Sequence, residues 1–222
     1  MNLAIDIVSD PVCPWCFIGK HRLTSALALV REKHPEVRFQ FNWLPYFLNP
    51  DTPLRGEPYR AFLEAKFGGA QQVNTLQHEV AEAGRDAGVA GVHFNFERIA
   101  IRPNTMRAHR LIYRAQSIGH RPEDVDALVE RLFIAHFQHG EDIGAIATLA
   151  EIAAECGDRK DHVIDYLESY EGTTQVRSLV GKVGDLGVSG VPFFLIQRRL
   201  AVAGAQSSVV LAAAILQAMN TH

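Results

Sequence analysis

Strand patterns lie near the two ends of this 222-residue chain, and helix patterns fill the long stretch between them. The β-branched run 3–9 and the alternating run 37–43 predict two strands with a helix between them. Two further short strands are predicted near the other end, at 191–196 and 200–204. The most economical fold joins both ends of the chain in one sheet, which makes the protein an α/β protein.

The helical middle is predicted to be inserted into this sheet domain. It follows a proline-rich connector, "PYFLNPDTPLRGEP", and carries helix signals such as Asn104 as an N-cap and Pro122 in a first turn. We therefore expect a sheet-containing domain at residues 1–50 and 187–222, and a helical insertion subdomain at residues 51–186.

Composition narrows the classes of function. The formal net charge is −3 and no Lys/Arg run forms a patch, so we expect neither nucleic acid nor a membrane surface as a partner. No segment approaches the roughly 20 apolar residues of a membrane helix. The first ten residues lack the basic and apolar regions of a signal peptide, and the expected location is therefore cytoplasmic.

The most informative motif is the Cys-Pro-Trp-Cys sequence that opens the first helix pattern. Two cysteines three positions apart at a helix start lie one turn apart, within reach of a disulfide. Free backbone N–H groups and the helix dipole stabilise a thiolate at Cys13. Pro14 suits the first helical position, and Trp15 offers an aromatic face for a substrate. The pattern predicts that Cys13 and Cys16 form a redox-active pair.

A metal site is the main alternative for a cysteine pair, and it needs two further ligands. The chain has three cysteines in all, and Cys156 stands alone in an alanine-rich helix pattern, where we interpret it as a small buried hydrophobe. His136 and His139 lie one turn apart, and the simpler interpretation is a pair of histidines favoured by the dipole at a helix C-terminus. We expect no metal and no cofactor besides the Cys13–Cys16 disulfide. An inert buried pair is the weakest interpretation, because Pro and Trp between two cysteines have no packing rationale.

The stretch "SGVPFFLI" is the second informative feature. A proline cannot donate to a strand ladder, so Pro192 is a candidate for a cis peptide bond in a tight turn. A trans proline at the start of an edge strand is the commoner alternative. If the two chain ends share one sheet, this turn lies beside the cysteines and the backbone of Val191 can pair with an extended substrate.

Five stretches together resemble the DsbA-like thioredoxin-fold family, and within it the cytosolic FrnE-like branch. They run in family order from Ser9 to Gln206: "SDPVCPWCFIGK", "FLNPDTP", "RPNTMRAHRL", "LFIAHFQHGEDI" and "GVSGVPFFLI…VAGAQ". The resemblance implies a thioredoxin fold with an all-helical insertion between the second strand and the cis-proline strand. It also implies thiol–disulfide exchange as the chemistry.

The resemblance further implies a role for each site residue. Cys13 would be the exposed nucleophile and Cys16 the buried resolving thiol, while Pro192 would be the cis-proline and Val191 the residue whose backbone pairs with substrate. The implied partners are proteins or small molecules that carry disulfides or dithiols, with glutathione as a candidate co-substrate.

Two positions depart from the pattern of thioredoxin-like proteins. Many of them hold a buried acid six positions before the first cysteine, where this chain has Ile7, and Asp6 is predicted to face the other side of the strand. The proton acceptor for Cys16 therefore stays open. The hairpin turn "QRR" also lacks the glycine or asparagine that a tight turn prefers.

Two other functions compete with thiol–disulfide exchange. Glutathione-dependent isomerases of 2-hydroxychromene-2-carboxylate and kappa-class glutathione transferases share the superfamily, but they typically carry serine at the first motif position. This chain keeps both cysteines, which favours redox chemistry. A non-catalytic, chaperone-like binding module is the other alternative.

Overall fold

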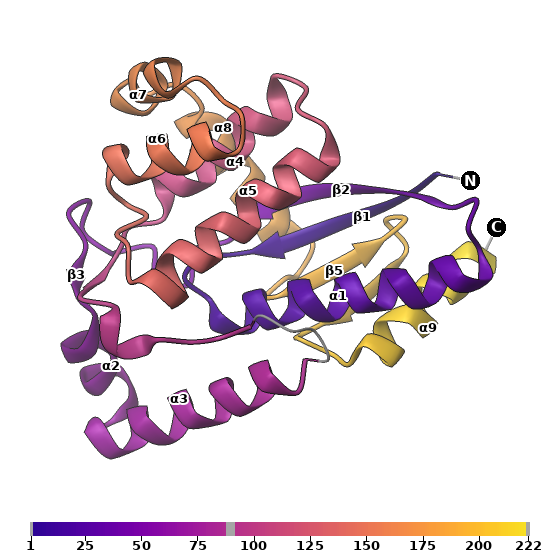
Figure 1. Cartoon of the computed structure of the whole chain (residues 1–222), viewed down its shortest axis with the longest axis horizontal. Helices are drawn as coiled ribbons and strands as arrows, with labels where there is room; N and C mark the ends of the chain where they lie inside the picture. Colours follow the sequence, from indigo (N-terminus) through magenta and orange to yellow (C-terminus); the bar gives the residue numbers. More distant parts are fainter. Residues whose placement is uncertain (1, 88–91, 221–222) are drawn as a thin grey trace.

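The two ends of the chain meet in one four-stranded sheet (Figure 1). A computed structural model describes residues 2–87 and 92–220. The strand order is β2-β1-β5-β6; β1 and β2 run parallel, and β5 runs antiparallel to both of its neighbours. The strands are β1 (Asn2–Ser9), β2 (Arg38–Pro45), β5 (Phe193–Ile196) and β6 (Leu200–Ala203). The predicted α/β fold with one shared sheet is confirmed.

Helices cover the sheet on both sides. The long helix α1 (Pro14–Lys33) follows β1 directly and packs alongside the last helix, α9 (Ser208–Asn220). Figure 1 shows α4 and α8 on the other side of β1 and β2, and both helices pack against β2. The cysteine motif therefore lies where the central strand β1 passes into α1, at the end of the sheet where the inserted helices approach it.

The insertion between β2 and β5 is mainly helical, with one addition. A two-residue ladder pairs β3 (Glu57–Pro58) with β4 (Ile101–Arg102). The inserted helices are α2 (Tyr59–Phe67), α3 (Ala70–Arg85), α4 (Met106–Ser117), α5 (Pro122–Ile134), α6 (Ile146–Glu155), α7 (Lys160–Glu168) and α8 (Thr173–Asp185). Among the helices of the described residues, none is both long and apolar enough to cross a bilayer.

Helix starts follow the predicted signals with one shift. Pro122 begins α5, as predicted. The N-cap of α4 is Thr105 rather than Asn104, so that prediction is wrong by one residue. The reason is that Asn104 makes a turn just before the helix: its Oδ1 accepts the Met106 N–H at 3.0 Å, and its Nδ2 donates to the Thr52 carbonyl at 2.6 Å.

Phe17 joins α1 to the insertion through a cluster of rings. Its fully buried side chain stacks on Phe133 of α5, with ring centroids 5.1 Å apart, and meets Phe94 edge to face at 5.9 Å. Truncating such a buried phenylalanine to alanine costs about 3–5 kcal/mol. This packing fixes the first turn of α1, and with it the cysteines, against the inserted helices.

A group of charged side chains makes a second link between α1 and α5. Lys20 Nζ lies 2.9 Å from both Asp126 and Glu130, and His21 Nε2 lies 2.8 Å from Glu130. Burial disfavours the Glu130 carboxylate, but the His21 hydrogen bond and the Lys20 charge outweigh it and hold its pKa below the ordinary value. A carboxylate whose pKa is lowered by folding stabilises the fold above its unfolded pKa, and that stability is lost as the pH falls through the folded pKa.

The contribution of Glu130 should therefore appear as a pH dependence. Between pH 6 and pH 3, the free energy of unfolding of the wild type is expected to fall by about 1 kcal/mol more than that of Glu130→Gln. Urea unfolding at several pH values measures the difference. Glu168→Gln, at the exposed end of α7, is the control and should follow the wild type closely. Identical pH dependence in wild type and Glu130→Gln would contradict this account.

The β5–β6 hairpin turns through two residues with left-handed backbone. Gln197 has φ 51° and Arg198 has φ 56°, the arrangement of a type I′ turn, in which Asn-Gly is preferred. A non-glycine residue in this region costs roughly 1–2 kcal/mol. Gln197→Asn combined with Arg198→Gly is therefore expected to raise the free energy of unfolding by about 1 kcal/mol, after the entropy cost of glycine. Thermal unfolding measures this gain in stability. The variant with alanine at both positions is the control and should not be more stable than the wild type.

Candidate functional site

Cys13 occupies the N-cap of α1. Its backbone is extended, with φ −94° and ψ 113°, and Pro14 takes the first helical position. The Cys13 N–H donates to the Asp10 carbonyl at 2.9 Å, and the Cys13 carbonyl accepts the N–H groups of Cys16 at 3.0 Å and Phe17 at 3.3 Å. Cys16 therefore lies in the first turn of α1, one helical turn after Cys13, as the spacing predicts.

The Val191–Pro192 turn lies directly against Cys13, although the two are 178 positions apart. The Val191–Pro192 peptide bond is cis. Cys13 Sγ lies 3.8 Å from the Val191 carbonyl oxygen, and the Pro192 carbonyl accepts the Gly204 N–H at 2.8 Å. The structure therefore brings together the motif cysteines and the turn that the sequence selects, because β5 pairs with β1.

The nucleophile that the resemblance implies to be exposed is buried. Only 4% of Cys13 is accessible, and 1% of Cys16. Trp15, between them, is 39% exposed. The expectation of an exposed Cys13 is wrong because Val191 lies against its sulfur and the side chain faces a cavity rather than the open surface.

Cys16 has an environment that favours the protonated thiol. Burial raises the pKa of Cys16 well above its ordinary value, and the neighbouring Cys13 raises it further. The polar groups of Ser9 and Asp10 act in the opposite direction but do not outweigh burial. Cys16 is therefore a thiol at neutral pH, which suits a group that reacts second.

The position six residues before Cys13 is apolar, as expected. Ile7 is fully buried in the core. Asp6 takes part in a different contact: Asn42 of the paired strand β2 donates to its carboxylate at 2.6 Å. Asp6 therefore interacts with the neighbouring strand β2 and not with the cysteine pair.

Asp10 is a buried acid that the sequence analysis did not select. It is 1% exposed; one carboxylate oxygen accepts the Leu48 N–H at 2.9 Å, and the other lies 3.6 Å from His109 Nε2. His109 in turn bonds the Tyr46 carbonyl at 3.0 Å. Its position between the first strand and the cysteine motif could have identified Asp10 as a candidate. Its contact with His109 on α4 could not be predicted, because the two residues are far apart in sequence.

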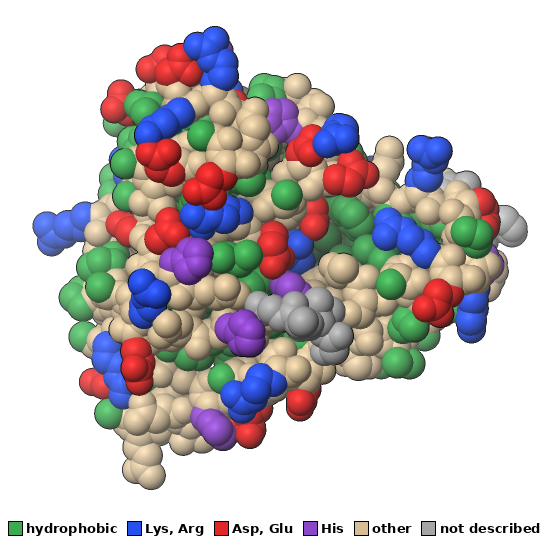
Figure 2. Space-filling model, in the orientation of Figure 1, with side chains coloured by type: hydrophobic (Ala, Val, Ile, Leu, Met, Phe, Trp, Pro, Cys, Tyr) green, Lys and Arg blue, Asp and Glu red, His purple; other side chains and the backbone are tan. Residues whose placement is uncertain are grey.

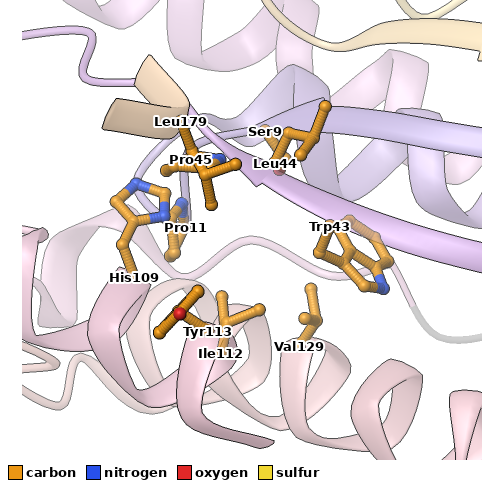
Figure 3. A pocket seen from close by; sticks show the side chains of 10 residues that line it. All are labelled: Ser9, Pro11, Trp43, Leu44, Pro45, His109, Ile112, Tyr113, Val129 and Leu179. Atoms are coloured by element: carbon orange, nitrogen blue, oxygen red, sulfur yellow. The ribbon is translucent and has the colours of Figure 1, made fainter. Parts of the chain in front are cut away.

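Figure 3 shows His109 and Pro11 side by side, with Ser9 nearby, around a small cavity at this end of β1. The volume of this cavity is about 10 Å³. A space of that size is at the lower limit for one water molecule. This space is a small packing gap near Asp10 and has no room for a substrate.

The two candidate histidines of the insertion differ in environment. His136 is fully buried in a π-helical turn, and burial lowers its pKa to about 4 despite the charge of Asp10. Both histidines lie in the last turn before Gly140, as interpreted, but burial keeps His136 uncharged, so the helix dipole does not account for this residue. His139 is exposed and lies 3.0 Å from Glu141. Cys156 is half-buried at the end of α6. Within residues 2–87 and 92–220, no three metal-binding side chains cluster.

The sequence analysis did not anticipate a cavity of about 340 Å³ beside Cys13. Cys13, Trp15 and Val191 line one part of it, and α2 and α3 supply apolar walls. Its acidic and basic side chains are few, whereas Figure 2 shows acidic and basic side chains interspersed over the visible face of the protein. The cavity could not be foreseen, because the sequence does not indicate where α2 and α3 pack relative to Cys13.

The comparisons with known proteins agree over the length of the chain. The sequence profile of the DSBA-like thioredoxin domain matches residues 4–216. The curated relative YwbO of Bacillus subtilis (strain 168), an uncharacterized protein, is 26% identical over 159 residues, which are 71% of this chain and 68% of YwbO.

Two solved structures share the fold. A probable DsbA oxidoreductase from Streptomyces coelicolor is 24% identical with a TM-score of 0.87, over 99% of this chain and 91% of that one. The cytosolic disulfide reductase DsbM from Pseudomonas aeruginosa, solved with GSH, is 16% identical with a TM-score of 0.58, over 97% of this chain and 96% of that one. These likenesses establish the fold, and the profile match establishes the family. This chain belongs to the DsbA-like thioredoxin-domain family.

Proposed function

We propose that the protein is a thiol–disulfide oxidoreductase that acts through Cys13 and Cys16. The Cys13 thiolate attacks one sulfur of a substrate disulfide, the substrate S–S bond breaks, and one thiolate leaves. A mixed disulfide then joins Cys13 to the other half of the substrate. Cys16 loses its proton to solvent and attacks Cys13 Sγ, which releases the second thiolate and leaves a Cys13–Cys16 disulfide. The substrate gains two electrons, and a dithiol or two molecules of a thiol such as glutathione reduce the pair again.

The placement of Cys13 carries this proposal. It sits at a helix N-terminus, where backbone N–H groups and the dipole favour an anion, and Cys16 follows one turn later. The Val191 carbonyl, 3.8 Å from Cys13 Sγ, marks the side from which an extended or flexible substrate can pair with the turn. Trp15 supplies the exposed apolar surface beside the sulfur.

The second step should depend strongly on pH. The pKa of Cys16 is raised mainly by burial, which persists after Cys13 has formed the mixed disulfide, so only a small thiolate fraction exists at neutral pH. The rate of resolution should therefore rise about tenfold per pH unit between pH 6 and pH 8. Stopped-flow mixing with a chromogenic aromatic disulfide separates the two thiol releases. Cys16→Ser should show the first release alone, and a second phase that does not change with pH would contradict the assignment.

The relatives support a reductive direction and a cytoplasmic location. The Pseudomonas aeruginosa protein of similar fold is described as a cytosolic disulfide reductase and was solved with GSH. From the sequence motifs that resemble it, we propose the FrnE-like branch for this chain. By analogy with DsbM, we propose reduction or isomerisation of disulfides, with glutathione as a candidate reductant. In a compartment kept reducing by thiols, these directions are easier to sustain than net oxidation.

A comparison of substrates separates this proposal from its alternatives. Turnover of insulin or bis(2-hydroxyethyl) disulfide with a thiol reductant supports the oxidoreductase. Turnover of a hydroxychromene carboxylate with glutathione, unaffected by Cys16→Ser, would support an isomerase instead. Suppression of aggregation that survives replacement of both cysteines, without disulfide turnover, would support a binding module.

A further inference from the structure

The cavity beside Cys13 has the size and lining of a small-molecule site. Its volume is about 340 Å³, roughly twice that of a cavity that holds benzene. A substituted aromatic ring or a medium alkyl chain fits such a space. Two helices supply many of the apolar side chains that line it, with Tyr59, Phe62 and Leu63 on α2 and Val73, Leu76 and Val80 on α3.

This cavity is also the way to the nucleophile. Cys13 is only 4% exposed, yet it lines the cavity together with Trp15 and Val191. A group bonded to the attacked sulfur therefore has to enter the cavity or lie across its mouth. A small, flexible disulfide meets this requirement more readily than a disulfide held inside a folded protein.

A buried arginine in the wall has one donor without a partner. Arg102 is 5% exposed, its guanidinium stacks over the Phe62 ring at 3.7 Å, and its Nη2 donates to Glu57. Its Nε is buried and has no hydrogen-bond partner among the described residues. Burial of an unpaired donor is unfavourable, whereas a planar guanidinium pairs well with a carboxylate. The same side chain lines the cavity, so an anionic ligand there would complete its hydrogen bonding.

Lys66 adds a second positive charge to the lining. Its Nζ donates to the amide oxygen of Asn49 at 2.9 Å, and within the part of the chain that the structure describes no carboxylate forms an ion pair with it. Glu79 is the one acidic residue in the lining, opposed by Lys66 and Arg102. Glu57, outside the lining, already pairs with Arg102. The groups that can receive an anion in this otherwise apolar wall are therefore the Lys66 ammonium and the unpaired Nε–H of Arg102.

Resting on the proposed function, we infer that this cavity selects low-molecular-weight disulfides in which one half carries an apolar body and a carboxylate. The apolar body would lie between α2 and α3, and the carboxylate would meet the guanidinium of Arg102 and the ammonium of Lys66. The sulfur attached to this half would then lie next to Cys13 and form the mixed disulfide, while the other half leaves as a thiolate. Dithiothreitol, or two molecules of glutathione, returns the protein to the dithiol.

Three symmetric disulfides test the two features separately. Bis(4-carboxybenzyl) disulfide has the ring and the carboxylate, bis(4-carbamoylbenzyl) disulfide has the ring alone, and dithiodipropionate has the carboxylate alone. Each kcat/KM is divided by the rate at which the same disulfide reacts with dithiothreitol, which removes differences in intrinsic reactivity. The normalised kcat/KM of the carboxybenzyl compound is expected to be about thirtyfold higher than that of dithiodipropionate, because its ring is buried. It is also expected to be about tenfold higher than that of the carbamoylbenzyl compound, because its carboxylate is bound.

Variants of the lining locate the effect. Leu76→Trp fills the space and should lower the ring preference about tenfold; Lys66→Gln should lower the carboxylate preference severalfold, and Arg102→Gln more strongly. Leu29→Trp on α1 is the matched control, because Leu29 is 39% exposed, against 38% for Leu76, and does not line the cavity. Lys33→Gln, at the exposed end of α1, is the matched control for charge.

Direct binding keeps this inference separate from the proposed function. In the Cys13→Ser/Cys16→Ser protein, calorimetry with the S-methyl thioether of 4-(mercaptomethyl)benzoate should show binding that Leu76→Trp abolishes and Leu29→Trp leaves unchanged. Equal normalised rates for all three disulfides, or no thioether binding, would overturn the inference even if insulin is reduced. Thioether binding without any disulfide turnover would support the cavity as a site for this ligand class and reject the oxidoreductase function.

Discussion

Replacing Cys13 by serine is expected to reduce kcat/KM for disulfide reduction at least about a thousandfold, to the level of the uncatalysed reaction. A serine hydroxyl is not ionised at neutral pH and cannot form a mixed disulfide. No other thiol can take over, because Cys16 is protonated and buried, and Cys156 caps the end of α6 and does not line the cavity at Cys13. The assay is reduction of bis(2-hydroxyethyl) disulfide coupled to a thiol reductant.

Two companion variants show how the cysteines divide the work. Cys16→Ser is expected to keep the first attack and to accumulate a protein whose mass is increased by one half of the substrate. Cys156→Ser should retain wild-type turnover and is the control for thiol content. If Cys156→Ser lost activity as fully as Cys13→Ser, a mechanism with three thiols would replace the one proposed here.

Gly19→Ala is expected to destabilise the protein by about 1–2 kcal/mol and to slow disulfide reduction about tenfold. An added Cβ would lie 2.8 Å from Cγ of Pro192 and 3.3 Å from Cζ of Phe194, closer than normal contacts. Overpacking of this kind costs roughly 1–3 kcal/mol, more than the 0.5–1 kcal/mol or so that alanine gains over glycine inside a helix. Relief of the contact moves the Val191–Pro192 turn away from Cys13, which explains the loss of rate.

The matched control for this variant is Gly181→Ala on α8. A Cβ at Gly181 would meet no atom within 4 Å, so this change should instead stabilise the protein by about 0.5–1 kcal/mol and leave turnover unchanged. Urea unfolding and steady-state rates measured on both variants give the comparison. Equal effects of the two substitutions would show that Pro192 does not pack against α1 as the structure has it.

Local sequence patterns predicted the frame of the site. The β-branched run of β1, the alternation in β2 and the proline before β5 located three strands of the sheet, since each signal lies within a few neighbouring residues. The Cys13–Cys16 spacing and Pro14 predicted the helix start for the same reason. The shared sheet followed from the need to pair strands at both ends of the chain.

The features that the sequence did not reveal depend on packing between distant segments. Cys13 is buried because Val191 lies against it, and His136 is neutral because the surrounding helices exclude water. The contact between Asp10 and His109 joins the loop after β1 to α4, and Arg102 reaches the cavity from the short strand β4. None of these neighbours is close in sequence, so periodicity and spacing contain no signal for them.

Redox equilibration of the Cys13–Cys16 pair tests the central claim most directly. The Cys156→Ser protein is equilibrated in buffers that contain different ratios of reduced to oxidised dithiothreitol. The reaction is then quenched, free thiols are alkylated, and the mass of the protein is measured by mass spectrometry. The account predicts a single two-electron transition between the reduced protein, in which both cysteines are alkylated, and the disulfide form, in which neither is. The ratio of the two forms should change tenfold for each change of about 30 mV in the potential of the buffer. Alkylation of both thiols in every buffer, or a transition that also occurs in Cys13→Ser, would contradict it.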